Sequence, residues 1–188
     1  MEFQKGPGGR MNRKTAGTRT GSPVDLLRVL HEEVDNLADK LALRHGPRLK
    51  CRMGCTPCCT DGLTVFEVEA ERIRRGHVAL LENDRPHPVG ACAFLDQEGA
   101  CRIYEDRPYV CRTQGLPLRW FEEDERGRTV EYRDICPLNE EGPALEELPE
   151  DDCWTIGPTE AHLAQLQRRD AGDELKRVAL RDLFRRKA

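Results

Sequence analysis

The first strong signal along the chain is a stripe of apolar residues with a helical period. Its members are five aliphatic side chains spaced three or four residues apart: Leu27, Leu30, Val34, Leu37 and Leu41. Ser22 can cap the start of this helix, Pro23 suits the first helical position, and Asp25 stands where a capping-box acid is expected. Pro47 predicts that the helix ends near His45. The stripe packs either on its own domain or on a second copy of the chain, so the pattern leaves the oligomeric state open.

Two further segments have helical patterns. Residues 66–76 predict a short helix with three apolar residues on one face: Phe66, Ala70 and Ile73. Residues 158–188 again carry apolar side chains at helical spacing, and Gly172 is expected to break or kink the helix there. The chain is therefore expected to be helical near both ends.

Alternating apolar and polar residues predict β-structure in the middle of the chain. Residues 116–122 and 128–134 predict a hairpin around a polar turn. Residues 93–95 and 101–104 predict a second, smaller hairpin with a cysteine on either side. We expect a mainly α fold with an irregular, cysteine-rich, metal-binding core and a minor β element. We expect the chain to have three regions: a tail at residues 1–21, a cysteine-cluster domain at 22–157 and a C-terminal helical segment at 158–188.

Composition narrows the function. Hydrophobic residues make up 38% of the 188-residue chain and charged residues 34%, which is lean for an ordinary core. Metal ligation would supply folding free energy that such a core lacks. The formal net charge of −4 and the aromatic content of 5% do not indicate a nucleic-acid partner.

The N-terminus lacks an apolar segment of the secretory type, and no window approaches the roughly 18 apolar residues that span a membrane. We therefore expect a cytoplasmic protein with no membrane contact. Thiols stay reduced in the cytosol, where dense cysteine patterns indicate metal binding or catalysis more often than disulfides.

Four of the nine cysteines fall within nine residues, in the run C-R-M-G-C-T-P-C-C, where Gly54 and Pro57 predict a loop. Thiolates held this close repel one another unless a cation neutralises them. We predict metal ligation by eight cysteines: Cys51, Cys55, Cys58, Cys59, Cys92, Cys101, Cys111 and Cys136. Whether Cys153 belongs to the site stays open.

Zinc and iron–sulfur clusters both take about four thiolates, so a single tetrahedral site cannot use all of these cysteines. Either two sites exist, or one polynuclear cluster does, or some thiols have chemistry of their own. Neighbours in an extended segment point in opposite directions, so Cys58 and Cys59 can serve different centres. Arg107 and Arg112 lie next to the later cysteines and are predicted to offset the negative charge of the centre from a second layer around the ligands. Tyr104 and Asp106 are candidate polar groups near the centre, although a core position is favoured for Tyr104.

Together these motifs resemble a known family. The spacing C-x3-C-x2-C-C, followed by C-x8-C-x-I-Y-E-x-R-P-x-x-C-R, is similar to that of the YkgJ-type cysteine-cluster proteins, whose shared domain is described as chelating zinc or iron. The resemblance covers about residues 50–115, with Cys136 as a further downstream match. It implies a metal centre and little more about activity.

The flagellin lysine N-methylases carry a similar cysteine cluster, which implies iron–sulfur and S-adenosylmethionine chemistry. This chain is short and has no G-x-G-type cofactor loop. The leading hypothesis is a cytoplasmic protein that binds an iron–sulfur centre, iron or zinc. The alternatives are a methylase-like, S-adenosylmethionine-dependent enzyme that modifies proteins, and a structural zinc module that binds a protein partner. The sequence leaves open whether the protein is an enzyme.

Overall fold

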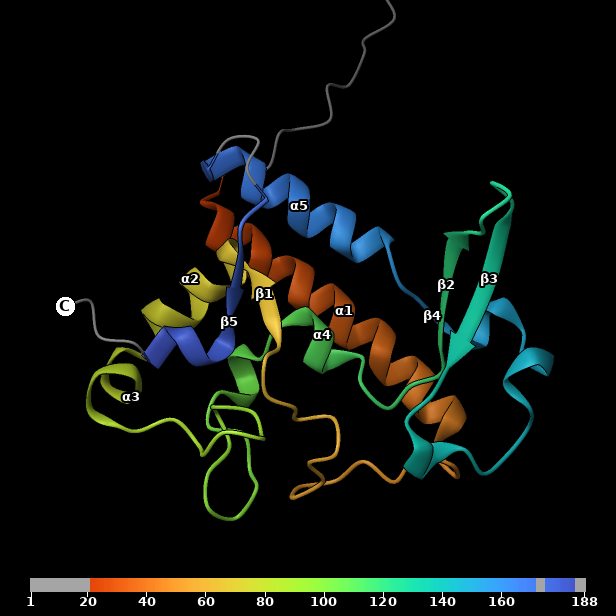
Figure 1. The fold of residues 1–188 in the computed structure, drawn as a ribbon, viewed down its shortest axis with the longest axis horizontal. Coiled ribbons are helices and arrows are strands. Elements are labelled where there is room, and N and C mark those ends of the chain that lie inside the picture. Colours follow the sequence, from red (N-terminus) through yellow and green to blue (C-terminus); the bar gives the residue numbers. More distant parts are fainter. Residues whose placement is uncertain (1–20, 172–174, 185–188) are drawn as a thin grey trace, which may run out of the picture.

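The computed structural model describes residues 21–171 and 175–184, so the predicted tail lies almost entirely outside the described residues. Figure 1 shows helices gathered on one side of the molecule and a projecting hairpin on the other. The helices are α1 (Pro23–His45), α2 (Glu67–Gly76), α3 (Val78–Asn83), α4 (Tyr109–Arg112) and α5 (Pro158–Ala171). The strands are β1 (Thr64–Phe66), β2 (Leu118–Glu123), β3 (Thr129–Asp134), β4 (Trp154–Thr155) and β5 (Arg177–Ala179). The mainly α class with minor β structure is confirmed.

Helix α1 begins as its sequence predicts. The Ser22 side chain accepts a hydrogen bond from the Asp25 backbone and Asp25 accepts one from Ser22 in return, which completes a capping box. The predicted stripe is buried within the protein's own core with one exception: Leu37 is 51% exposed. Ala38 takes the inward position, because it lies closer to the direction of Val34 around the helix.

The C-terminal segment departs from its prediction. Helix α5 forms and ends at Ala171, but the described residues beyond it form a short strand and a 3-10 helix in place of the expected α-helix. Strand β5 pairs antiparallel with β1, with Val178 opposite Val65, and a 3-10 turn (Leu180–Phe184) follows. A strand of three residues depends on a partner more than 100 positions away, so local periodicity could not reveal it.

The predicted hairpin of β2 and β3 is confirmed, with Trp120 opposite Tyr132. Strand β4 adds a short parallel edge to β2. The smaller predicted hairpin is reduced to a single antiparallel bridge between Leu95 and Cys101. Within the described residues, no helix is long and apolar enough to cross a membrane.

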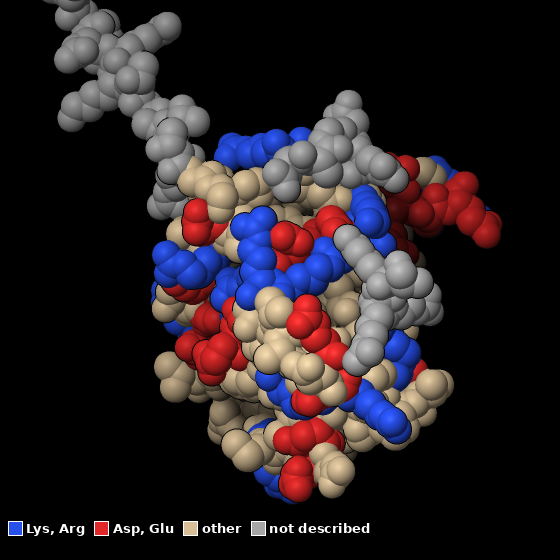
Figure 2. Space-filling model, turned by 90° about the vertical axis from the view of Figure 1, so that its left-hand side faces the viewer, with Lys and Arg blue, Asp and Glu red and all other residues tan. Residues whose placement is uncertain are grey.

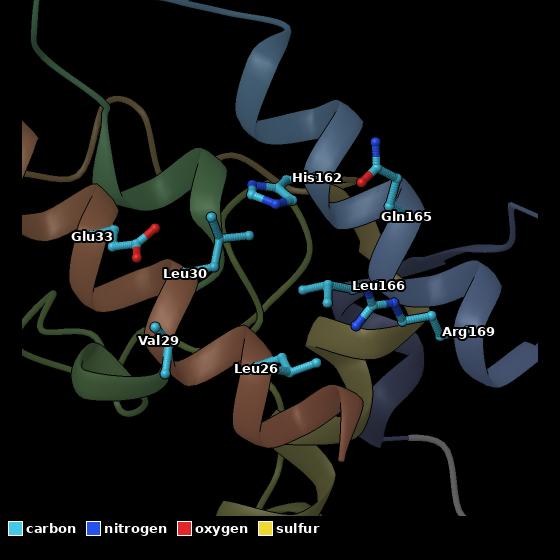
Figure 3. Close-up of a pocket in the computed structure, with 8 residues that line it drawn as sticks. All are labelled: Leu26, Val29, Leu30, Glu33, His162, Gln165, Leu166 and Arg169. Carbon is cyan, nitrogen blue, oxygen red and sulfur yellow. The ribbon is translucent and has the colours of Figure 1, made fainter. Parts of the chain in front are cut away.

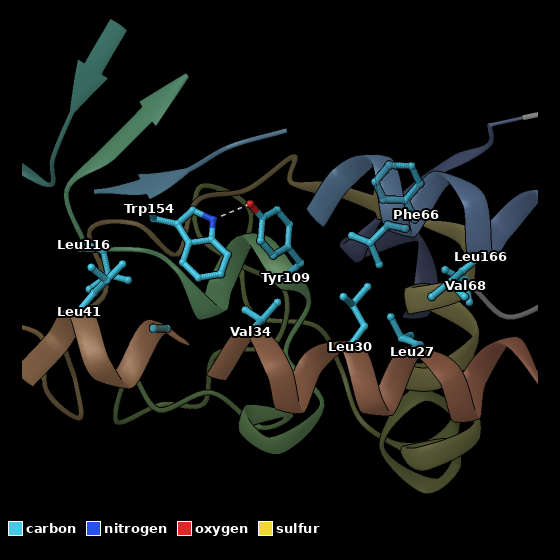
Figure 4. Close-up of a cluster of buried hydrophobic side chains, with 12 residues drawn as sticks. Leu27, Leu30, Val34, Leu41, Phe66, Val68, Tyr109, Leu116, Trp154 and Leu166 are labelled. Carbon is cyan, nitrogen blue, oxygen red and sulfur yellow. Dashed lines mark hydrogen bonds between the residues drawn. The ribbon is translucent and has the colours of Figure 1, made fainter. Parts of the chain in front are cut away.

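Two hydrophobic clusters form the core. The first joins α1, α4 and α5 around Leu27, Tyr109 and Leu163 (Figure 4). The second joins α2, the 92–103 segment and the C-terminal residues around Ile73 and Phe94. The second cluster matters for the site, because Cys92 is part of it and Cys59 and Cys101 pack against it.

The first cluster contains one buried polar contact that can be tested. Trp154 Nε1 donates a hydrogen bond of 2.8 Å to the Tyr109 hydroxyl oxygen, and both side chains are buried (Figure 4). Tyr109→Phe leaves the indole N–H without this acceptor, and we expect it to lower the free energy of unfolding by about 1–3 kcal/mol. Urea denaturation measures the change. Tyr132→Phe on the exposed hairpin is the control, with an expected effect within about 0.5 kcal/mol; equal effects for the two variants would contradict the prediction.

Candidate metal centre

The cysteine run is a series of turns without regular secondary structure, as expected. The Cys55 backbone N–H donates to the Arg52 carbonyl at 3.0 Å, and the Cys59 N–H donates to the Thr56 carbonyl at 2.8 Å. Gly54 has a φ of +80°, a conformation that glycine adopts without strain. The two turns reverse the chain twice and so bring several sulfurs into one region.

This loop is fastened to the segment that carries the next cysteines. The Cys92 N–H donates to the Cys59 carbonyl at 2.8 Å. At the tip of the 96–100 turn, a Cβ on Gly99 would approach Thr56 Cγ2 to 3.2 Å, so the two loops are in close contact. The remaining predicted ligands come from other elements: Cys111 from α4, and Cys136 from the N-terminal end of a 3-10 turn (Pro137–Asn139). All nine cysteines are free thiols.

One group of sulfurs is centred on Cys55. Burial raises the pKa of the Cys55 thiol, and the charges of Cys51, Cys58 and Cys136 raise it further. Charge interactions weaken with distance, so these four sulfurs share one neighbourhood. We call Cys51, Cys55, Cys58 and Cys136 the first quartet.

A second group is centred on Cys111. Burial raises the pKa of Cys111 to about 12, and the charges of Cys92 and Cys101, followed by those of Glu69 and Cys58, add to the increase. The pKa of Cys59 is raised by a hydrogen bond with Cys58, by burial, and by the charges of neighbours that include Cys92 and Cys111. We call Cys59, Cys92, Cys101 and Cys111 the second quartet.

The two quartets meet at one peptide bond. Cys58 and Cys59 are adjacent in the sequence, and a hydrogen bond with Cys59 lowers the pKa of Cys58 to about 6. The pair titrates as a unit, with one thiolate held by its neighbour's proton. At neutral pH the boundary between the quartets thus already carries a thiolate.

The thiols are grouped but not closed around a metal-sized space. In the part of the chain that the structure describes, no three His, Cys, Asp or Glu side chains are arranged to hold a metal ion as they stand. The donor set nevertheless suits such a group, because two sets of four thiols match what zinc, iron and iron–sulfur clusters require. Binding would draw the sulfurs of each quartet together.

Arg112 and Arg107 face helix α1. Arg112 is buried; its guanidinium donates to the Asp35 carboxylate, to the Arg107 carbonyl at 2.8 Å and to the Glu105 carbonyl at 2.9 Å. The Arg107 guanidinium lies 3.8 Å from the Asp35 carboxylate. Burial raises the pKa of the Cys101 thiol, and the Arg107 charge lowers it by a smaller amount. These arginines therefore fix the segment that carries Cys111 against α1.

Two other residues of this segment contact side chains other than the cysteines. Tyr104 is 57% exposed and its ring lies under the Arg107 guanidinium at 4.2 Å, so the prediction of a core position for Tyr104 is wrong. Asp106 forms an ion pair of 2.7 Å with Arg72 and contacts His77 Nε2 at 2.9 Å.

Cys153 lies apart from both quartets. It is buried, which raises the pKa of its thiol, and the main charges around it belong to Arg133 and Arg119. Asn139 and Gly115, by contrast, contact Cys51 and were not expected from the sequence. An asparagine in an acidic loop and a glycine before a strand have no recognisable pattern, so only the fold could reveal them.

The described part of the surface also contains hollows. A hollow of about 260 Å³ lies between α1 and α5, where Leu30 and Glu33 face His162 (Figure 3), and its lining contains no cysteine. Figure 2 shows Lys and Arg side chains interleaved with Asp and Glu side chains on the face that it presents. That face therefore has no uniformly basic patch of the kind that binds nucleic acid.

One comparison with known proteins found a match. Residues 50–137 match the sequence model of the family described as "CxxCxxCC: Putative zinc- or iron-chelating domain". The matched segment includes both quartets and ends one residue after Cys136. No curated protein and no solved structure matches the chain.

Proposed function

We propose that the segment at residues 50–137, which matches the family model of a zinc- or iron-chelating domain, binds two metal centres, one at each quartet. The proposal is supported by the charges that the thiols exert on one another: Cys51, Cys58 and Cys136 act on Cys55, and Cys92, Cys101 and Cys58 act on Cys111. Each set has the ligand count of one zinc ion, one iron ion or one iron–sulfur cluster.

The connections between the quartets support two centres rather than one. Cys58 interacts with Cys55 of the first quartet and with Cys59 of the second. The hydrogen bond between the Cys58 and Cys59 thiols would place the border between the two centres at adjacent residues, which keeps two anionic centres close together. The backbone bond from Cys92 to Cys59 then ties the second quartet to the same loop.

Four protein thiolates complete the coordination of a tetrahedral metal. A catalytic zinc keeps one position for water or substrate, whereas a structural zinc does not. The donor sets therefore support a structural role for zinc, or an electron-carrying or storage role for iron. On this basis we propose metal binding itself as the function of the domain.

The test is a metal and acid-labile sulfide analysis of protein purified without oxygen, together with its visible spectrum. We expect two metal centres per wild-type chain, one in Cys55→Ser and one in Cys101→Ser, because each variant breaks a different quartet. Cys153→Ser is the matched control and should keep both centres. Sulfide and visible absorbance would identify iron–sulfur clusters, and colourless protein with two zinc ions would identify zinc.

Three results would contradict the proposal. Full metal content in both quartet variants would exclude these cysteines as ligands. Complete loss of metal in either single variant, with the fold retained, would indicate one polynuclear centre. Metal-free wild-type protein after anaerobic purification and reconstitution would remove metal binding itself.

A further inference from the structure

Asn139 is a buried side chain at the edge of the first quartet. It has no exposed surface, and it lies two residues beyond the segment that matches the chelating domain. It ends the 3-10 turn that begins after Cys136, and its backbone N–H donates to the Cys136 carbonyl at 2.7 Å. One short turn thus places a ligand candidate and a fully buried amide side by side.

Both ends of the Asn139 amide are used. Its Oδ1 accepts a hydrogen bond of 2.8 Å from the Lys50 backbone N–H, which fixes which end of the amide is the donor. Its Nδ2 donates to the Gly115 carbonyl at 2.8 Å and contacts Cys51 Sγ at 3.6 Å. An amide nitrogen carries two hydrogens, so one serves the carbonyl and the other points to the sulfur.

The Cys51 sulfur lies against the Gly115 backbone and the Asn139 amide. Gly115 has a φ of +90°, and a Cβ at this position would collide with Cys51 Sγ and would approach Asn139 Nδ2 to 3.2 Å. Only glycine both adopts this conformation without strain and leaves room for the sulfur. Cys51 is exposed overall, yet its sulfur rests in a cradle formed by a glycine backbone and a buried amide.

Arg48 stabilises the turn that carries Asn139. This residue is buried, and its guanidinium donates to the Asn139 carbonyl at 2.9 Å and to the Glu140 carbonyl at 3.1 Å. Arg48 therefore fixes the turn without being hydrogen-bonded to sulfur. It offers a control that disturbs the same turn and leaves the N–H···S contact in place.

We propose that Asn139 is a positioning residue for the first metal centre: its amide N–H donates to the Cys51 thiolate, orients the sulfur and stabilises its negative charge. The inference rests on the proposed function, since it needs the first quartet to bind metal. A donor to a ligating thiolate lowers the charge on sulfur, and such outer contacts tune metal affinity and reduction potential.

The experiment titrates metal-free, reduced full-length protein with Co²⁺ and follows the thiolate-to-cobalt absorption and the affinity of each site. Asn139→Ala removes the donor, and we expect about 10- to 100-fold weaker binding at the first quartet and a shifted charge-transfer band. The second quartet should be unchanged. Arg48→Gln should lower the urea stability of the metal-free protein without shifting the band.

A double-variant comparison separates positioning from a general effect on folding. Cys51→Ala removes the sulfur, so adding Asn139→Ala to it should cost no further affinity if Asn139 acts through Cys51. Full additivity of the two losses would overturn the inference, as would an unshifted band in Asn139→Ala. Wild-type protein that binds no Co²⁺ would overturn the proposed function as well, whereas two wild-type sites with an unchanged Asn139→Ala variant would overturn the inference alone.

Discussion

A chelator in excess is expected to remove metal from the protein in two phases, from the first quartet before the second. The first quartet is carried by turns at the surface, where Cys51 is exposed and the neighbouring Met53 is 90% exposed. The second quartet borders the hydrophobic core, where Cys92 is buried and Cys59 and Cys101 pack against the second cluster. Release from the core requires local opening of packed structure, and an opening cost of about 1.4 kcal/mol already slows release about tenfold.

The measurement is the absorbance of a coloured chelator after rapid mixing, with protein at neutral pH. Cys55→Ser should abolish the fast phase and leave the slow one, while Cys101→Ser should do the reverse. Cys153→Ser, outside both quartets, should show both phases at wild-type rates. A single phase in the wild-type protein, or loss of the fast phase in Cys101→Ser, would contradict the assignment of the exposed quartet as the labile one.

The elements that could be predicted from sequence are those determined locally. Helix α1 follows from its capping box and its aliphatic stripe, and the β2–β3 hairpin follows from alternation around a turn. Strand β5 could not be foreseen in the same way, because it exists through its pairing with β1. The prediction that Leu37 is buried was wrong, because a residue three or four positions after Val34 can face the core. Tertiary packing buries Ala38 and leaves Leu37 exposed.

The site divides in the same manner. The spacing of the cysteines indicated metal and allowed Cys58 and Cys59 to serve different centres, but it could not assign eight sulfurs to two groups. That assignment depends on segments far apart in the chain, such as Cys136 returning to Cys55. The hydrogen bond from Arg112 to Asp35 could not be predicted from the sequence either, since 77 positions separate the two residues.

The second large effect is expected from pH, and it differs between the quartets. A thiol must lose its proton to ligate a metal, so metal binding releases protons and weakens as the pH falls. Every thiol of the second quartet has a pKa above the usual 9.0. Burial is the main cause at Cys92, Cys101 and Cys111, and the hydrogen bond with Cys58 is the main cause at Cys59. At pH 7 this quartet therefore holds four protons that the metal must displace.

The first quartet holds at least one proton fewer, because the hydrogen bond with Cys59 lowers the pKa of Cys58 to about 6. Between pH 7.5 and 6.5 we expect metal affinity to fall by up to about 10,000-fold at the second quartet and by at most about 1,000-fold at the first, one decade for each displaced proton. The second quartet is thus expected to release its metal more slowly at neutral pH, but to lose more metal affinity than the first quartet as the pH falls.

Calorimetric titration in buffers of different ionisation enthalpy measures the number of protons released at each site. Cys55→Ser isolates the second quartet and Cys101→Ser the first, so the two counts can be read separately. Equal proton release at the two sites would contradict the lowered pKa of Cys58. Release of fewer than four protons at the second quartet would contradict four-thiolate ligation there, because its thiols are still protonated before the metal arrives.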